Sequence, residues 1–326
     1  MVMATGIVSL AAAGSRLRNI GLGLFALNVL LYLAFLTALA IRIAIARQAV
    51  VADLSDHAKA PGFFTMVAAP CVLGSQCLVL AGRIDVAALL LGVGLVHWLA
   101  LSFVMMPFLM TSETKPPQER GLSGAWLLVV VGTQAISVLV SMIAYRTPAC
   151  PEWVVFASSC FWLAGSMIYF WLMAQIFNRI LFLPLAAEQL TPPYWINMGA
   201  MAIATLAGAR LVLLADRFAF LADLLPFVKG TTLLFWATAT WWIPILIALG
   251  VGRHVRHKFP IVYDHSYWAA VFPLGMYTVA TRTMSEALRL PFLKPIPDGF
   301  VWIALAAWVV VIFGFMRWLA KSLKSN

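Results

Sequence analysis

The sequence predicts an all-α membrane protein with ten transmembrane helices, and three observations support that fold class. Hydrophobic residues make up 63% of the 326-residue chain, charged residues make up 10%, and the mean hydropathy is +0.96. This composition is typical of proteins that cross a membrane several times. Ten apolar segments fill nearly the whole chain, and a helix needs about 20 residues to cross a hydrocarbon core about 30 Å thick. The alternation of apolar and polar residues that marks membrane strands is absent from the sequence.

The ten segments follow one another closely and form one domain, residues 1–326. The first segment is short, and it lacks the charged leader and the cleavage site of a signal peptide. We therefore expect it to be the first transmembrane helix. The predicted spans are 1–14, 18–46, 63–81, 85–110, 121–145, 152–182, 192–214, 225–251, 265–289 and 298–321.

The loops alternate in length, which groups the spans into five helical hairpins. Small and polar residues gather in the middle of the odd spans, whereas the even spans carry clusters of Trp and Phe. Such residues are costly to expose to lipid. We therefore expect the odd helices to form an inner ring and the even helices to surround it. The candidate pore-lining residues are Thr5, Gly6, Ser9, Gly74, Gln76, Gly132, Gln134, Asn197, Gly199 and Thr278.

Two odd spans contain a proline, Pro70 and Pro273. Proline removes a backbone hydrogen bond and bends a helix, and neighbouring helices or water can satisfy the freed carbonyl. Pro107 and Pro244 lie on even spans. A kink that serves packing alone therefore remains an alternative to a kink that serves transport.

The formal net charge of +10 sets topology rather than indicating nucleic acid, because the basic residues are spread over short loops. Twelve Lys and Arg residues lie on the loops after even spans and at the C-terminus, and eight lie on the opposite loops. The positive-inside rule places both termini in the cytoplasm, in a multi-pass protein of the inner (plasma) membrane.

Three charged residues lie within the spans: Arg210 in the seventh, and Arg282 and Glu286 in the ninth. Arg282 and Glu286 are four residues apart, so they share a helix face and can pair. If both helices run outward, the two guanidinium groups lie at similar depth near the external end. Two arginines against one carboxylate attract anions. Snorkelling of Arg210 to the outer headgroups is the alternative.

Phe272 precedes Pro273 and lies ten residues, or about 15 Å, inward of Arg282. An aromatic ring beside a helix bend can block a narrow lumen by excluding water. Ordinary packing is the alternative.

Several other classes of protein lack the residues they need. The four cysteines have no CxxC spacing, which argues against a metal or redox site. Of the five histidines only His97 lies well inside a span, so a bis-His haem is not expected. The phosphate loop of an ATP motor and the HExxH and GxSxG motifs of hydrolases are absent from the sequence. We expect no enzyme activity, no cofactor and no metal.

Four motifs resemble the tellurite-resistance/dicarboxylate transporter family, which includes the slow anion channels of plant guard cells. They occur in family order on odd spans and cover essentially the whole chain. They are Met3-Ala-Thr-Gly-Ile-Val-Ser9; Phe63-Phe-Thr-Met-Val-Ala with Val72-Leu-Gly-Ser-Gln76; Pro192-Pro-Tyr-Trp-Ile-Asn-Met-Gly-Ala-Met201; and Phe272-Pro-Leu-Gly-Met-Tyr-Thr-Val-Ala280.

The resemblance implies ten helices around a central pore, often in a homotrimer, and transport of small anions such as malate, sulfite, nitrate or chloride. Some members confer tellurite resistance. It also implies that Phe272 occludes the pore. The chain lacks the long regulatory tails of the plant channels, so their regulation by phosphorylation is not carried over.

The sequence therefore predicts an anion channel or transporter whose partners are a small anionic solute and the lipid bilayer. Arg210 and Arg282 would attract the anion, and Phe272 would gate the lumen. The alternative is a proton-coupled carrier of four-carbon dicarboxylates with Glu286 as the proton site.

Overall fold

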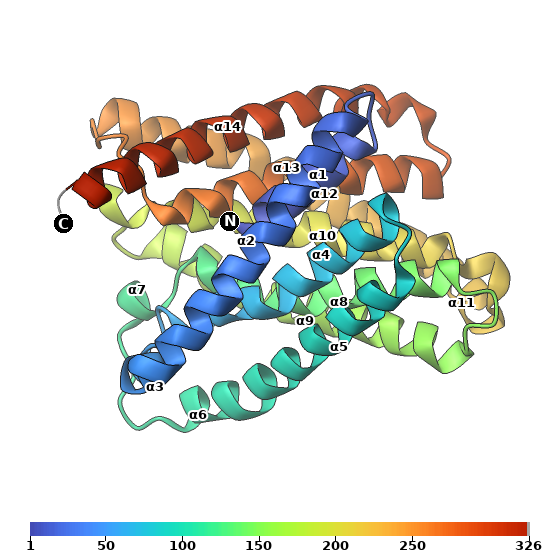
Figure 1. The fold of residues 1–326 in the computed structure, drawn as a ribbon, viewed down its shortest axis with the longest axis horizontal. Coiled ribbons are helices and arrows are strands. Elements are labelled where there is room, and N and C mark those ends of the chain that lie inside the picture. Colours follow the sequence, from blue (N-terminus) through green and yellow to red (C-terminus); the bar gives the residue numbers. More distant parts are fainter. Residues whose placement is uncertain (325–326) are drawn as a thin grey trace.

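The computed structural model of the chain describes residues 1–324 and consists of helices that lie side by side (Figure 1). Within that range there is no β-strand. The α-helices are α1 (Val2–Ala13), α2 (Arg18–Ile45), α3 (Arg47–Ser55), α4 (Thr65–Leu80), α5 (Ile84–Ala100), α6 (Met106–Thr111), α7 (Gln118–Gly121), α8 (Leu128–Arg146), α9 (Glu152–Phe182), α10 (Ile196–Val212), α11 (Ala219–Asp223), α12 (Leu225–Val251), α13 (Trp268–Ala287) and α14 (Pro295–Lys324).

Eight helical segments of the described chain are long and apolar enough to cross a membrane. Two of the ten predicted spans, those that form α1 and α13, are not among the eight. Helix α1 has only 12 residues, and α13 carries Arg282, Glu286 and several threonines. Both are largely buried by other helices, so neither needs a continuous apolar surface.

The helices fall into a buried set and an exposed set. In the spans that contain α4, α8 and α10, between 67% and 89% of the apolar window is buried, whereas in the other five spans this share is between 11% and 39%. Helices α1 and α13 join the buried set. Contacts among the five buried helices follow a closed order: α1 with α4, α4 with α8, α8 with α10, α10 with α13, and α13 with α1. Each also contacts the exposed helix that follows it in the chain.

Four of the five buried helices begin with a short 3₁₀ turn. These turns are η1 (Ala60–Phe64), η3 (Gly124–Leu127), η5 (Pro192–Trp195) and η8 (His265–Tyr267), and they contact one another in that order. Each includes an aromatic residue, as expected at a membrane interface. Because α8 and α13 begin after these turns, they start at Leu128 and Trp268 rather than at the predicted residues 121 and 265.

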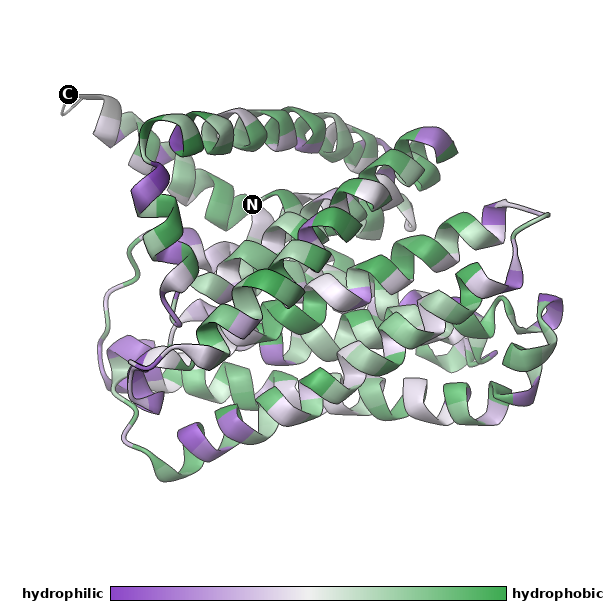
Figure 2. Cartoon of the chain, turned by 90° about the horizontal axis from the view of Figure 1, so that it is seen from below, coloured by the Kyte–Doolittle hydropathy of each residue, from purple (hydrophilic) through white to green (hydrophobic). Residues whose placement is uncertain are grey.

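Hydrophilic residues gather towards the ends of the bundle, and the middle is mainly hydrophobic (Figure 2). One end holds α3, α6, α7 and the C-terminal end of α14, and the other end holds α11 (Figure 1). We call these the α3 end and the α11 end. The two outer segments α5 and α12 are each continued by a π-helical turn, Leu101–Met105 and Gly252–Arg256.

Candidate functional site

The five buried helices enclose a cavity of about 240 Å³. Each of the five contributes to its wall. The lining residues are Ile7, Leu10, Ala13 and Gly14 from α1 and its end; Cys71, Val72, Ser75 and Val79 from α4; Ala135, Val138 and Met142 from α8; Ile203, Leu206 and Arg210 from α10; and Met276, Val279, Arg282, Thr283 and Glu286 from α13.

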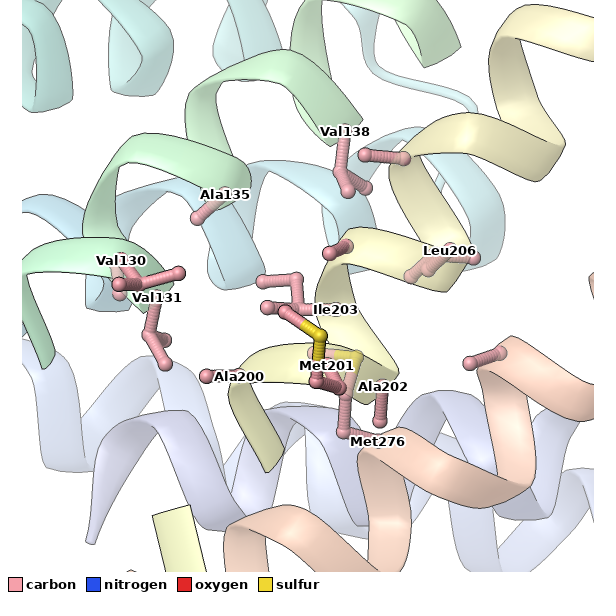
Figure 3. Close-up of a cluster of buried hydrophobic side chains, with 14 of the residues drawn as sticks. Val130, Val131, Ala135, Val138, Ala200, Met201, Ala202, Ile203, Leu206 and Met276 are labelled. Carbon is pink, nitrogen blue, oxygen red and sulfur yellow. The ribbon is translucent and has the colours of Figure 1, made fainter. Parts of the chain in front are cut away.

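The cavity has an apolar floor and a polar mouth. The five buried helices alternate with returning helices, so all of them run from the α3 end towards the α11 end. The lining residues earliest in each helix are therefore the deepest, and they are apolar or weakly polar. Figure 3 shows Ala135 and Val138 of α8, Ile203 and Leu206 of α10, and Met276 of α13 in one buried cluster. The charged residues lie last in their helices, near the α11 end.

Arg210 lies at this mouth without an ion pair inside residues 1–324, although the negative charge of Glu286 acts on it from a greater distance. Among residues 1–324, no side chain or carbonyl hydrogen-bonds its guanidinium group, and its Nε atom is buried. A buried donor without a partner costs free energy.

Arg282 is paired, but not with Glu286 as the sequence suggested. Its Nη1 donates to the carbonyl oxygen of Ala11 at 3.1 Å, and its Nη2 lies 3.5 Å from a carboxylate oxygen of Asp298. A Cβ atom at Gly14 would lie 2.6 Å from Nη1, so Gly14 makes room for the guanidinium group. The long side chain therefore reaches across to α1 and α14 instead of folding back along its own helix.

Glu286 lies exposed at the mouth and forms no ion pair within the described part of the chain. Since Asp298 offsets the charge of Arg282, the charges left without a direct partner at the mouth are those of Arg210 and Glu286. The structure thus brings the three intramembrane charges of the sequence together around one cavity.

Phe272 lies one helical turn below the cavity floor. It is four residues before Met276, and the side chains of Phe272, Met276, Val279, Thr283 and Glu286 recur at spacings of three and four, which is one face of a helix. Phe272 is 3% exposed and does not line the cavity. The face that lines the cavity on α13 therefore continues into a buried aromatic ring.

The polar residues predicted to line the pore use their side chains differently. Thr5 accepts a hydrogen bond from Trp308 of α14 at 3.0 Å, and Ser9 donates to the carbonyl of Gly21 on α2 at 2.7 Å. Gln76 accepts from Asn28 of α2 at 2.6 Å, and Gln134 donates to the carbonyl of Trp162 on α9 at 3.0 Å. None of these four lines the cavity. Their bonds join the buried helices to the exposed ones.

The predicted glycines let helices approach closely. A Cβ atom at Gly199 would lie 2.8 Å from Cγ of Pro273, and one at Gly6 would lie 2.6 Å from Cγ1 of Val72. Gly74 of α4 faces Leu139 of α8, and Gly132 of α8 faces Val67 of α4, so both glycines lie in the contact between these two helices. Packing rather than access to the cavity accounts for these positions.

Asn197 and Thr278 are fully buried but do not line the cavity. Thr278 donates to the carbonyl of Leu274 on its own helix at 2.9 Å. Both side-chain polar atoms of Asn197 are buried without a hydrogen-bond partner in the described residues. Pro70 and Pro273 lie inside α4 and α13, as predicted.

Sequence reasoning missed most of the actual lining. Ile7, Leu206 and Met276 are ordinary apolar residues, and Thr283 was not singled out. Ser75 belongs to a small, polar motif of its span but was not among the predicted pore-lining residues. The available signal was the spacing from Arg282 and Glu286 back to Phe272, which marks one face of α13. The described chain contains no group of three or more His, Cys, Asp or Glu residues that could hold a metal ion.

The fold and the cavity define a polytopic helical membrane protein with a charged cavity inside the bundle. Residues 1–316 match the SLAC1 family, described as voltage-dependent anion channels, and the chain belongs to this family. The resemblance deduced from the four motifs is thereby confirmed.

Individual relatives agree with this membership. A sulfite efflux pump, SSU1 of Trichophyton rubrum, is 24% identical over 63% of this chain and 56% of its own length. An uncharacterized transporter of Methanocaldococcus jannaschii is 24% identical over 91% of this chain and 83% of its own length. An uncharacterized membrane protein of Mycobacterium tuberculosis is 40% identical over 44% of this chain and 73% of its own length.

Proposed function

We propose that the protein carries small anions across the membrane through a pore enclosed by α1, α4, α8, α10 and α13. In this proposal the ten helices act as five hairpins, with an inner ring of odd members and an outer ring of even members. The closed order of contacts among the five buried helices supports the ring, and the cavity that all five line supports the pore.

The observation that carries the proposal is the guanidinium group of Arg210 in the wall of that cavity, which forms no hydrogen bond or ion pair within residues 1–324. Burial weakens screening by water, so a positive charge there attracts an anion more strongly than one at the surface. Arg282 lines the same mouth, where the two arginines face the carboxylates of Glu286 and Asp298. Arg146 adds a further positive charge that acts on Arg210. We assign both arginines to anion attraction.

Phe272 is the proposed gate. Its ring is buried one turn below the floor of the cavity, and Pro273 follows it in the helix. Pro273 cannot donate a backbone hydrogen bond, so the helix can bend at this point more readily than elsewhere. Rotation of the ring away from the axis would join the cavity to the α3 end.

Candidate substrates are sulfite, four-carbon dicarboxylates such as malate, tellurite, chloride and nitrate. Sulfite is placed first because a related chain is named a sulfite efflux pump. A cavity of about 240 Å³ has the volume of roughly eight liquid waters, enough for a partly hydrated small anion.

For the membrane arrangement, we propose that the α3 end faces the cytoplasm of the inner membrane, because most loop Lys and Arg residues lie there. Both termini then lie on the cytoplasmic side. A homotrimer, as the family resemblance implies, is proposed for the assembly.

The testing experiment is flux of chloride, nitrate, sulfite and malate through the purified protein in liposomes, with membrane potential and pH gradient imposed separately. A channel passes several anions in response to potential alone. Failure of all four anions to move, in protein shown to be folded, would overturn the proposal.

A second candidate function is a proton-coupled carrier of four-carbon dicarboxylates. The position of Glu286 favours it, because this carboxyl group is exposed at the cavity mouth and forms no ion pair in the described chain. This carrier requires malate uptake that is driven by a pH gradient and lost in Glu286→Gln. Uptake that persists in the variant would exclude Glu286 as the proton site.

A further inference from the structure

A second cavity, of about 470 Å³, lies outside the ring of buried helices, on the side of the bundle that α2 covers. Its walls come from α2, from the start of α1, and from η1 and α4. His97 of α5 completes it. Many α2 side chains are exposed, as expected for a helix that faces lipid acyl chains. We call this second cavity the α2 groove.

The α2 groove has a charged end. Lys59 Nζ lies 2.8 Å from one carboxylate oxygen of Asp53, and Arg42 hydrogen-bonds the other oxygen. All three residues border the groove at the α3 end. Among these bordering residues two cations share one carboxylate, which leaves an excess of one positive charge. Asp56 also acts on Lys59 but does not border the groove.

The exposure of the three side chains shows which of them can reach a ligand. Asp53 is only 17% exposed, whereas Arg42 and Lys59 are 49% and 62% exposed and keep free donors. Hydrogen bonds from Lys59 and then Arg42 lower the pKa of Asp53 below its ordinary value. The carboxylate therefore stays ionised and holds both cations beside the groove.

The rest of the groove is mainly apolar, with Tyr32, Thr65 and His97 as its polar residues, and it has the length of one lipid leaflet. Along α2 it runs from Arg42 through Leu39 and Phe35 to Tyr32, ten residues that span about 15 Å. The hydrocarbon core is about 30 Å thick, so each leaflet supplies about 15 Å. The opposite wall includes Met66 and Ala69 of α4.

We propose that the α2 groove binds an anionic phospholipid, with its phosphate at Arg42 and Lys59 and one acyl chain along Tyr32 to Leu39. The excess positive charge selects an anionic headgroup over a zwitterionic one. The apolar walls hold an acyl chain of either lipid. This site is separate from the anion pathway, and the proposal does not depend on the transport function.

Native mass spectrometry of the purified, delipidated protein tests the site. The protein is titrated with phosphatidylglycerol and with phosphatidylcholine of identical acyl chains. We expect the first phosphatidylglycerol to bind at least about fivefold more tightly than the first phosphatidylcholine. This factor corresponds to the attraction that one basic residue at a membrane surface exerts on an anionic lipid. Equal affinities would overturn the proposal.

Variants locate the site. Arg42→Gln combined with Lys59→Gln should make the affinities for phosphatidylglycerol and phosphatidylcholine equal. Ala69→Phe should weaken the binding of both lipids to the same extent, because the larger side chain fills the groove. Arg47→Gln is the matched control: Arg47 is exposed on α3 but does not border the groove, so the preference should persist. A preference that survives the double substitution would place the lipid elsewhere.

Two further measurements cover other outcomes. If the double variant does not fold, the unmodified protein is titrated at rising salt concentration. Its preference for phosphatidylglycerol over phosphatidylcholine must then decline, because salt screens the charges of Arg42 and Lys59. If a second copy of the chain covers the groove instead, Phe35→Cys in a Cys150→Ser, Cys160→Ser background will form a disulfide between subunits when a mild oxidant is added. That crosslink would contradict lipid occupancy.

Discussion

Arg210 and Glu286 carry the two charges at the cavity mouth that no direct ion pair satisfies within residues 1–324. Arg282, by contrast, is held by Ala11 and Asp298. At the scale of single residues, the three charges thus differ in their freedom to meet a solute. We expect Arg210 to have the larger effect on transport and Arg282 to have a larger share in joining α13 to α1 and α14.

Arg210→Gln should reduce anion flux in liposomes by about tenfold, which corresponds to about 1.4 kcal/mol of lost attraction. The reason is that glutamine keeps hydrogen-bond donors but removes the unpartnered charge. Arg16→Gln is the control, since Arg16 is exposed near the same end of the bundle and does not line the cavity. Equal loss in both variants would assign the effect to surface charge rather than to Arg210.

Phe272→Ala should raise anion flux at zero imposed voltage, because removal of the ring opens the layer below the cavity floor. Loss of a buried aromatic side chain also costs about 3–5 kcal/mol of stability, so the melting temperature in detergent must be measured alongside flux. Phe235→Ala is the control, since Phe235 is 1% exposed and packs on Trp162. Flux that is unchanged in folded Phe272→Ala protein would remove the gate.

At the scale of helices, small residues decide how closely the buried set packs against its neighbours. Gly208 of α10 faces Thr232 of α12 and Trp162 of α9. A methyl group there would overlap the hydroxyl group of Thr232 and lie 3.0 Å from the indole ring. Both neighbours are buried, so they have little room to move.

Gly208→Ala should therefore destabilise the protein by about 1–3 kcal/mol, the usual cost of overpacking. Thermal unfolding in detergent provides the measurement. Gly230→Ala on α12 is the matched control, because nothing lies within 4 Å of its added Cβ atom. Its melting temperature should stay the same or rise, since alanine favours a helix interior more than glycine. If Gly208→Ala were as stable as the control, the close contact of α10 with α12 would be wrong.

The helices themselves were predictable from sequence, whereas the direction of each polar side chain was not. Apolar length placed most helices to within a few residues, because the thickness of a bilayer fixes the length of a span. Helix α8 begins at Leu128, seven residues after its predicted start. A polar residue on a buried helix, however, can face the cavity or a neighbouring helix. Thr5 and Gln134 face neighbours, and only the packed arrangement reveals which choice a residue makes.

In the candidate site, likewise, the sequence predicted which residues matter but not which partners their side chains contact. The sequence identified Arg210, Arg282 and Glu286 because charges are rare in spans, and the structure gathers them at one mouth. It gave the wrong partner for Arg282, because Asp298 lies beyond the next turn of the chain and spacing along one helix cannot reveal it.

At the scale of the whole molecule, the membrane topology can be tested at two loops, which are separated by a single membrane-length helix, α8. Cys150 lies after α8 at the α11 end, and Glu113 lies before it at the α3 end. If the α3 end faces the cytoplasm, a membrane-impermeant maleimide labels Cys150 in intact cells. It labels Glu113→Cys, in a Cys150→Ser background, only after permeabilisation. Cys160 is replaced by serine in both proteins.

The labelling of Cys150 should also depend on pH in a defined direction. Burial raises the pKa of the Cys150 thiol above its ordinary value, against a smaller opposing effect of Arg217. The thiolate is the reactive form, so labelling at neutral pH should be slower than for Glu113→Cys and should continue to accelerate at higher pH. The opposite result would invert the proposed orientation: the maleimide would label Glu113→Cys in intact cells, and it would not label Cys150 in the protein that retains this cysteine. That result would then place the mouth with Arg210 and Glu286 on the cytoplasmic side, where it would collect anions for export instead of meeting them from outside.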